Sequence, residues 1–517
     1  MRSWKRTRRQ FLFTTAAIGA AGFIGPRVRS VRAQDKRVLN ARMDGDISVL
    51  DPGYMVGAEE IDVQTAVMPA LIEFSTEDGQ LGWRKTPFVK EISQRDDGIH
   101  IDFTLNPGFP WSNGYGEVSA EDVKYSFERM ADSDWAGNWA ALDHVETTDK
   151  YSGTIVLTQP FEPVWLNSLS GGTGSVICKA ATEAAGGRYT TEIPATCGPY
   201  LYKWTPKQRI TFVRNPDWPG PQPDFDEINY IIVEEVSAAE LAYEAGELDI
   251  TEISAPTAAR YQDSPPPNSV MQRAGALQYM WMGMNTQHPK LQDIRVRQAI
   301  QHAVDVDSIL AGAYSGVAER SYGVVCPGLP GKRSQTSIDY NPEKSRALLS
   351  DAGVSGLELD LRTLNWQERL LACQIIQANL AAVGVTANII PMDSGPYWEM
   401  GQESKGDQWK DLQLWLMRFG SGPDPYEPFQ WFVKDQIGIW NWERWSDPKF
   451  EELYQSGLGE SDIEKRSAIY IRMQEIMEET GAYVWVCHEP ENYIHGTYFQ
   501  PDLWPTGQLN FNNFKLV

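Results

Sequence analysis

The sequence predicts an α/β protein built from two or more globular units. Its 517 residues are more than one compact core accommodates, and 42% hydrophobic with 22% charged residues is typical of a folded chain. Segments typical of strands and helices alternate along the chain without a visible repeat. Because no flexible Gly/Ser linker separates them, we expect the units to be joined tightly, as in a hinged body.

The first half carries one clear strand and two clear helices. Apolar and polar residues alternate over 99–105, which is typical of a half-buried strand. Ser119, with Asp122 three residues later, predicts the start of a helix. A second helix is expected from Ser237, with Glu240 as its capping partner, to a stop at Gly246.

The second half predicts a βαβ unit. Asn341 caps a helix that Pro342 can enter and that Gly353 ends. A strand over 357–361, a long helix over 367–383 and a strand over 385–390 follow. This order favours a parallel sheet.

The first 33 residues are typical of an export signal. Thr7-Arg8-Arg9-Gln10-Phe11-Leu12-Phe13 resembles a twin-arginine motif, and the apolar stretch to Gly25 is too short to span a bilayer. Small residues at Val31 and Ala33 predict cleavage near Ala33. A membrane anchor is the alternative, which the short apolar stretch disfavours. We therefore expect an exported, periplasmic protein that is soluble once residues 1–33 are removed.

The charge balance argues against nucleic acid as a partner. Asp and Glu outnumber Lys and Arg by 69 to 46, for a formal net charge of -23. A duplex would repel such a surface, and no run of basic residues follows the signal.

All five cysteines follow the signal. Cys178 and Cys197 close a short loop and are expected to form a disulfide in an oxidising compartment. Cys373 lies in an apolar helical stretch and is expected to be a buried small hydrophobe. Whether Cys326 pairs with Cys487 stays open.

Nothing in the sequence calls for an enzyme, a metal or a cofactor. The six histidines form no HExxH motif, and Gly171-Gly172-Thr173-Gly174 lacks the Lys-Ser/Thr pair of a phosphate loop. No GxSxG elbow and no CxxC pair occur. We therefore predict no catalytic and no metal-ligating residue.

Tryptophan is the strongest compositional signal. Seven of the nineteen fall between positions 398 and 445: Trp398, Trp409, Trp415, Trp431, Trp440, Trp442 and Trp445. An indole ring covers a large apolar area and keeps one N–H donor, which suits a ligand cavity as well as a core. Core packing is the simpler explanation for each ring alone, but we expect one or two of the seven to line a cavity.

Ordered blocks over nearly the whole chain after residue 33 resemble one family, the extracytoplasmic solute-binding proteins of peptide/nickel/opine importers. They include Phe-Thr-Leu at 103–105, Trp-Ser-Asn-Gly at 111–114, Ser-Ala-Glu-Asp-Val at 119–123, Cys-Gly-Pro-Tyr-Leu at 197–201, Arg-Asn-Pro at 214–216, Arg-Val-Arg-Gln-Ala-Ile at 295–300, Tyr-Asn-Pro-Glu-Lys at 340–344 and Asp424-Pro425.

The resemblance implies a two-lobed periplasmic binding protein fold with an extra subdomain in the first lobe. Crossings expected at 285–288 and 487–490 give lobe I as 34–285 plus 490–517, the subdomain as about 76–197, and lobe II as 286–489. The resemblance further implies a monomer that captures a small-molecule ligand between the lobes, delivers it to an ABC permease in the inner membrane, and performs no chemistry.

The same resemblance places the ligand-binding residues. We expect them at Tyr54, Trp111, Asn285, Trp366, Trp415, Arg418, Phe419, Ser421 and Asp424. For each of them, packing or surface exposure is the alternative.

One departure from the family pattern bears on the ligand. Peptide-binding relatives carry an Asp before the acidic-Pro pair to hold the ligand ammonium, and this chain has Ser421 there. A hydroxyl lacks the ion-pair contribution of about 1.5–3 kcal/mol, although Asp424 or a Glu from elsewhere can replace the charge. We therefore expect an opine-like sugar–amino acid conjugate, an oligosaccharide or a modified peptide. A nickel chelate is disfavoured because histidines are few.

Three rival functions remain. An ordinary di- or oligopeptide receptor of the same family would bind free-amine peptides tightly. A secreted hydrolase with an acidic pair in the Trp-rich region would turn over a glycoside. A chaperone-like binder of extended peptides would show broad, weak affinity.

Overall fold

Three β-sheets of four or more strands form the frame of this computed structural model. It describes residues 36–55, 57–77, 80–262, 264–274, 277–504 and 506–517. Residues 37–517 form one compact unit. The predicted signal peptide lies outside the described residues. Among the described helices, none has both the length and the apolar character that crossing a bilayer requires.

The first large sheet has seven strands in the order β12–β19–β11–β1–β10–β9–β8. In chain order these are β1 (Val38–Met43), β8 (Tyr200–Thr205), β9 (Arg209–Arg214), β10 (Glu227–Ile232), β11 (Ile250–Glu252), β12 (Ser269–Ala274) and β19 (Glu491–Gly496). Strand β1 pairs in parallel with β10 and β11, and the remaining pairs are antiparallel. The helices of this part are α1 (Ala58–Val67), α4 (Val236–Glu244) and α5 (Ala255–Tyr261).

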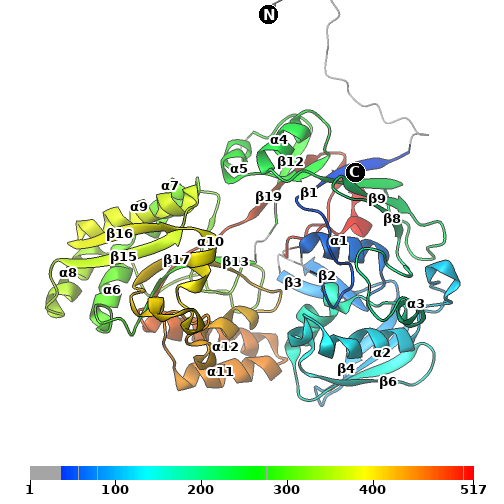
Figure 1. The fold of residues 1–517 in the computed structure, drawn as a ribbon, viewed down its shortest axis with the longest axis horizontal. Helices are drawn as coiled ribbons and strands as arrows, with labels where there is room; N and C mark the ends of the chain where they lie inside the picture. Colours follow the sequence, from blue (N-terminus) through cyan, green and yellow to red (C-terminus); the bar gives the residue numbers. More distant parts are fainter. Residues whose placement is uncertain (1–35, 56, 78–79, 263, 275–276, 505) are drawn as a thin grey trace, which may run out of the picture. The chain divides into compact units, whose positions relative to one another are not determined.

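The second large sheet has six strands in the order β14–β18–β13–β17–β15–β16. These are β13 (Gln278–Met284), β14 (Glu319–Arg320), β15 (Leu357–Leu364), β16 (Val385–Met392), β17 (Leu414–Gly420) and β18 (Tyr483–His488). Its helices are α6 (Ile294–Ala303), α7 (Val306–Ala313), α8 (Pro342–Asp351), α9 (Gln367–Ala382), α10 (Ser394–Glu399), α11 (Pro448–Gly459) and α12 (Ile463–Glu479). The predicted βαβ unit is confirmed, because β15 and β16 are parallel neighbours and α9 between them packs on both (Figure 1).

A smaller sheet follows the order β4–β5–β7–β6. Its strands are β4 (Val89–Gln94), β5 (His100–Leu105), β6 (Leu142–Thr147) and β7 (Ser152–Leu157), with α2 (Ala120–Glu128) and α3 (Lys179–Ala184) beside them. Strand β5 confirms the alternation seen over 99–105, because its apolar residues are buried and its polar ones are half-buried. Two-stranded pairs, β2 (Ile72–Glu77) with β3 (Gln80–Lys85) and β20 (Phe499–Gln500) with β21 (Lys515–Leu516), complete the described strands.

The chain changes from one large sheet to the other earlier than the crossing expected at 285–288. Strand β13, which a boundary at residue 285 assigns to the first lobe, pairs with β17 and β18 of the second large sheet. The chain therefore changes sheet between β12 and β13, before residue 278. Gly275, a residue type common in turns, stands in the short connection that precedes β13, but β13 is nearly all apolar, so its sequence pattern does not show which sheet it joins.

The capping residues predicted from the sequence are confirmed at two of three helices. Ser119 and Asp122 form the predicted capping box of α2, and the Asn341 side chain accepts a hydrogen bond from Lys344 N–H at the start of α8. Helix α4 differs, because it begins at Val236 without a side-chain cap. Glu240 instead accepts hydrogen bonds from the N–H and Oγ of Ser254, both at 2.8 Å, and so ties α4 to the start of α5.

The expected disulfide does not form. Cys178 and Cys197 are free thiols buried in the apolar core of the small sheet, and the three other cysteines are also free and buried. Burial raises the pKa of Cys197 to about 12, which keeps that sulfur protonated and unreactive. Cys373 is a buried core residue, as predicted.

A carboxylic acid is buried within the aromatic core of the second sheet. Glu443 is 0% exposed, and its Oε1 accepts a hydrogen bond from Trp281 Nε1 at 2.7 Å. Gly283 makes room for this contact, since a Cβ there would lie 2.5 Å from Glu443 Oε1 and 2.4 Å from Trp415 Cε2. Burial raises the pKa of Glu443 from its ordinary value of 4.5 to about 8.

This buried acid predicts a pH-dependent stability. Between pH 4.5 and 8 the unfolded chain releases the Glu443 proton while the folded chain retains it, so the free energy of unfolding falls as pH rises. We expect Glu443→Gln, which resembles the protonated acid, to flatten this decline. Unfolding in guanidinium chloride at pH 5, 6, 7 and 8 measures the free energy of unfolding of both proteins.

The matched control is Glu452→Gln, because Glu452 is 65% exposed and pairs with Lys449 at the surface. In Glu452→Gln the free energy of unfolding should fall with rising pH as steeply as in wild type. Equal declines in Glu443→Gln and wild type would contradict the assignment of a retained proton to Glu443.

Candidate functional site

The carboxyl ends of the parallel strands meet the two connections between the large sheets. Gly420 at the end of β17 pairs with Gln278 at the start of β13, and Glu252 at the end of β11 pairs with Tyr493 near the start of β19. In open α/β sheets, ligands bind beside the carboxyl ends of strands. The candidate site therefore lies around the connection from β18 to β19, at residues 489–491.

Two arginines and one carboxylate form the basic end of this site. Glu489 Oε2 lies 2.7 Å from Arg418 Nη1 on β17, and its Oε1 lies 3.0 Å from Arg369 Nη2 on α9. Trp366, which precedes α9 and is 42% exposed, lies with its ring centroid 5.9 Å from each guanidinium. The structure thus brings the predicted residues Trp366 and Arg418 together, and adds Arg369 and Glu489.

The acidic end of the site begins on the other side of Pro490 from Glu489 and consists mainly of carboxyl groups. A cavity of about 140 Å³ is lined there by Asp44, Glu59, Asp62, Glu252 and Glu491, with Arg42 as the basic residue of the lining. Arg42 Nη1 lies 3.3 Å from Glu252 Oε2, and its other nitrogens donate to the carbonyls of Val233 and Glu234, both at 2.9 Å. One arginine therefore faces five carboxyl groups.

Burial raises the pKa of four of these groups, namely Glu59, Asp62, Glu252 and Glu491. Desolvation and then the hydrogen bond with Asp44 raise the pKa of Glu59 to about 8, and desolvation followed by repulsion from Glu252 raises that of Glu491 to about 7. The positive charge of Arg418 acts in the opposite direction on Glu491. The acidic end therefore lies within electrostatic reach of the basic end.

Sequence reasoning missed Glu489 and Glu491. The available signal was the run Glu489-Pro490-Glu491 at the expected second crossing, where two carboxylates flank a proline. The rest of the acidic end is gathered from α1 and from the ends of β1 and β11, so no local motif reveals it.

Phe419 points away from Arg418 into a group of indoles, of which Trp281 is buried and Trp398, Trp431 and Trp440 are partly buried. Its ring centroid lies 5.1 Å from that of Trp281, and 5.9 to 6.3 Å from those of Trp398, Trp431 and Trp440. Because successive strand residues face opposite sides, Phe419 and Arg418 belong to different faces of the second sheet.

Tyr54 and Trp111 take part in contacts elsewhere in the first part of the chain. The Tyr54 hydroxyl donates to Asp132 O at 3.2 Å, and its ring centroid lies 3.5 Å from the Arg188 guanidinium. Trp111 is 3% exposed, and its Nε1 donates to the Asp122 carboxylate of α2.

Asn285 and Trp415 are structural residues of the second sheet. Asn285 Nδ2 donates to the carbonyls of Trp409 and Leu412 at 3.1 and 3.0 Å, and its Oδ1 accepts from Gln287 N–H. Trp415 is 0% exposed and packs edge-on against Trp442.

The loop that follows β17 holds Ser421 and Asp424. Ser421 N–H donates to Leu277 O at 2.6 Å, beside the first connection between the large sheets. Asp424 is 1% exposed, and both its oxygens accept from Arg466, each at 2.8 Å. A ligand ammonium could use Asp424 only by displacing a buried guanidinium.

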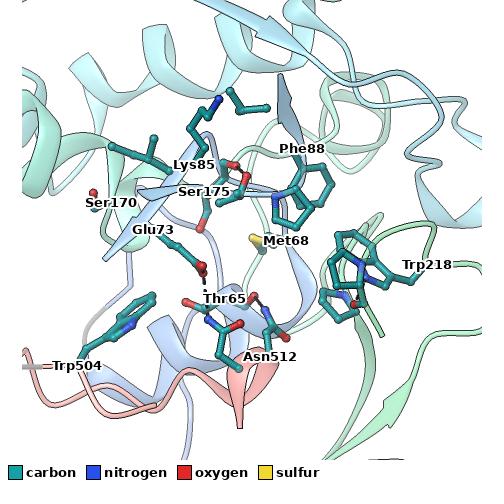
Figure 2. A pocket seen from close by; sticks show the side chains of 18 of the residues that line it. Thr65, Met68, Glu73, Lys85, Phe88, Ser170, Ser175, Trp218, Trp504 and Asn512 are labelled. Carbon is teal, nitrogen blue, oxygen red and sulfur yellow. Dashed lines mark hydrogen bonds between the residues drawn. The ribbon is translucent and has the colours of Figure 1, made fainter. Parts of the chain in front are cut away.

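Figure 2 shows a larger pocket, of about 480 Å³. Its labelled lining runs from Thr65 and Met68 of the first part of the chain to Trp504 and Asn512 near the C-terminus. Asn512 Nδ2 donates to Thr65 O at 2.7 Å, and Glu73 is bound by Arg84, Asn510 and Asn513. None of the predicted ligand residues lines it.

Comparison with known proteins identifies the class. The family model "Bacterial extracellular solute-binding proteins, family 5 Middle" matches residues 83–440. The chain is 25% identical over 470 residues to the dipeptide-binding protein of Escherichia coli K12, covering 82% of this chain and 84% of the relative.

Solved structures share the fold. HbpA2 from Haemophilus parasuis superposes with a TM-score of 0.81 at 22% identity, covering 93% of this chain and all of that one. MoaA from A. tumefaciens R10, solved with mannopinic acid, gives a TM-score of 0.70 at 21% identity, over 93% of this chain and all of that one.

The α/β sheets and the two connections between them thus define a two-lobed periplasmic binding protein fold. The chain belongs to family 5 of the bacterial extracellular solute-binding proteins, as the sequence blocks indicate. Members of this family are binding proteins, not enzymes: they bind small ligands outside the cytoplasm and deliver them to ABC permeases. This chain is the substrate-binding receptor of such an importer.

The buried pair of Asp424 and Arg466 yields a stability prediction. Removing the Asp424 charge leaves the Arg466 charge unpaired in the interior. Asp424→Asn should therefore lower the free energy of unfolding by about 3–5 kcal/mol. Denaturant unfolding measures the loss. Asp435→Asn, at an exposed position nearby, is the control and should stay within about 0.5 kcal/mol of wild type. A loss below about 1 kcal/mol in Asp424→Asn would show that the pair is not a structural link.

Proposed function

We propose that this protein captures a small zwitterionic solute between its two lobes. The observation that carries the proposal is the opposition of charge across Pro490, with the Arg418 guanidinium on one side and the carboxyl groups of Glu252 and Glu491 on the other. A solute with a carboxylate and an ammonium group matches both ends. Arg418 can take the carboxylate in a two-pronged hydrogen bond, and the Trp366 ring can cover an apolar side of the solute.

An opine-like sugar–amino acid conjugate is the preferred ligand within this class. Ser421 supplies no charge, and Asp424 is occupied by Arg466, so the loop after β17 offers no free carboxylate for a peptide ammonium. The mannopinic acid in the MoaA structure is a ligand of this chemical class. An oligosaccharide or a modified peptide is the next choice, and the E. coli relative named for dipeptides keeps an ordinary peptide as the alternative.

The strand order of the two large sheets supports an assignment of the lobes. We assign residues 37–274 and 491–517 to the first lobe and 278–488 to the second, in place of the expected boundary at 285. The subdomain of about 76–197 contains the small sheet, α2 and α3. Export by the twin-arginine-like signal, cleavage near Ala33, a periplasmic location and a monomeric state complete the proposal.

A ligand screen tests the function. The chain from residue 34 would be screened by thermal shift against sugars, opines, short peptides and metal chelates, because a ligand of the folded state raises the melting temperature as its concentration exceeds Kd. We expect a shift confined to sugar–amino acid conjugates. A plain di- or tripeptide bound with submicromolar Kd would overturn the ligand class, and turnover of a glycoside would overturn the receptor.

Arg418→Ala should weaken carboxylate-bearing ligands tenfold or more, because a charge-assisted hydrogen bond contributes about 1.5–3 kcal/mol. Isothermal titration calorimetry against the best ligand measures the change. Arg472→Ala, on the surface of α12 with a similar carboxylate contact, is the matched control and should leave Kd unchanged. An unchanged Kd in Arg418→Ala would remove that residue from the site.

A further inference from the structure

Glu489 lies in the connection from the second large sheet to the first. It follows β18 directly, and Pro490 separates it from β19. Its carboxylate contacts two guanidinium groups of the second lobe, Arg418 at 2.7 Å and Arg369 at 3.0 Å. Its side chain is 19% exposed, so both ion pairs are partly shielded from solvent.

Arg369 and Arg418 differ in how far their side chains are buried and in how many groups hold them. The Arg369 side chain is 2% exposed, and its Nη1 donates to the buried Tyr314 hydroxyl at 3.2 Å. The Arg418 side chain is 35% exposed and donates to no described group other than Glu489. Arg369 is therefore a fixed partner of Glu489, and Arg418 is the partner that can turn to another anion.

The charges of the basic end leave room for one more anion. Two guanidinium groups face a single carboxylate, so the group carries an excess of one positive charge. When a ligand carboxylate takes Arg418, Glu489 keeps its ion pair with Arg369 and is not left as an isolated partly buried charge. The exchange thus replaces one ion pair with another of the same kind.

We propose that Glu489 is a specificity-determining residue: it occupies Arg418 in the unliganded protein and yields it only to a carboxylate that competes successfully. This inference rests on the proposed role of Arg418 in ligand binding. A weakly coordinating anion such as chloride does not form the paired hydrogen bonds that a carboxylate forms, so the internal competitor discriminates against it.

The test uses acetate as the probe, so it needs no identified ligand. Acetate would be titrated against the chain from residue 34 at ionic strength held constant with sodium chloride, and the thermal shift would give an apparent Kd. Glu489→Gln keeps the shape of the side chain but removes the competing charge. It should bind acetate roughly threefold or more tightly than wild type.

Two further variants make the outcome specific. Glu489→Asp should also bind acetate more tightly than wild type, because its shorter side chain keeps a charge near Arg369 but withdraws from Arg418. Glu489→Asp is the test variant if Glu489→Gln fails to fold. Adding Arg418→Gln to either variant should abolish the gain.

Equal acetate affinity in wild type and both Glu489 variants would overturn the proposal, as would a gain that survives Arg418→Gln. Failure of the ligand screen alone would instead count against the proposed solute, since the acetate titration does not depend on it.

Discussion

The passage of the chain between the two large sheets constrains the rest of the molecule. Strands β12 and β13 belong to different sheets, as do β18 and β19, and each pair is joined by only a few residues. Because the connections lie beside the carboxyl ends of β11 and β17, side chains from both sheets meet there. The position of the proposed ligand site thus follows from topology, and its chemistry depends on which residues end those strands.

That chemistry is a contrast of charge across one proline. Arginines gather on the side of the second sheet, and carboxyl groups with raised pKa values gather on the side of the first. Partly buried charges interact more strongly than surface ones, so this contrast would orient the proposed dipolar solute as well as attract it.

The sequence was a better guide to elements than to the site. Capping residues such as Ser119 and Asn341 act within one turn of helix, and the alternation over 99–105 reflects one strand, so local patterns predict them. Site residues depend on contacts between distant segments. Trp415 and Asp424 carry the right chemistry for a ligand but are already enclosed by Trp442 and Arg466, while Glu489 acquires its importance from two arginines 71 and 120 positions earlier in the chain. Family resemblance pointed to strand ends beside the connections between the large sheets, and it could not tell which side chains at those ends are enclosed by neighbours.

The buried thiols have a consequence for the order of folding and export. In the folded chain Cys178, Cys197, Cys326, Cys373 and Cys487 are enclosed, and an oxidase has no sulfur to attack. An unfolded chain that entered an oxidising compartment would present all five at once, and bridges could form that the folded structure does not contain. If the chain is exported as proposed above, a route that moves it only after it has folded would keep all five sulfurs out of reach of such oxidation.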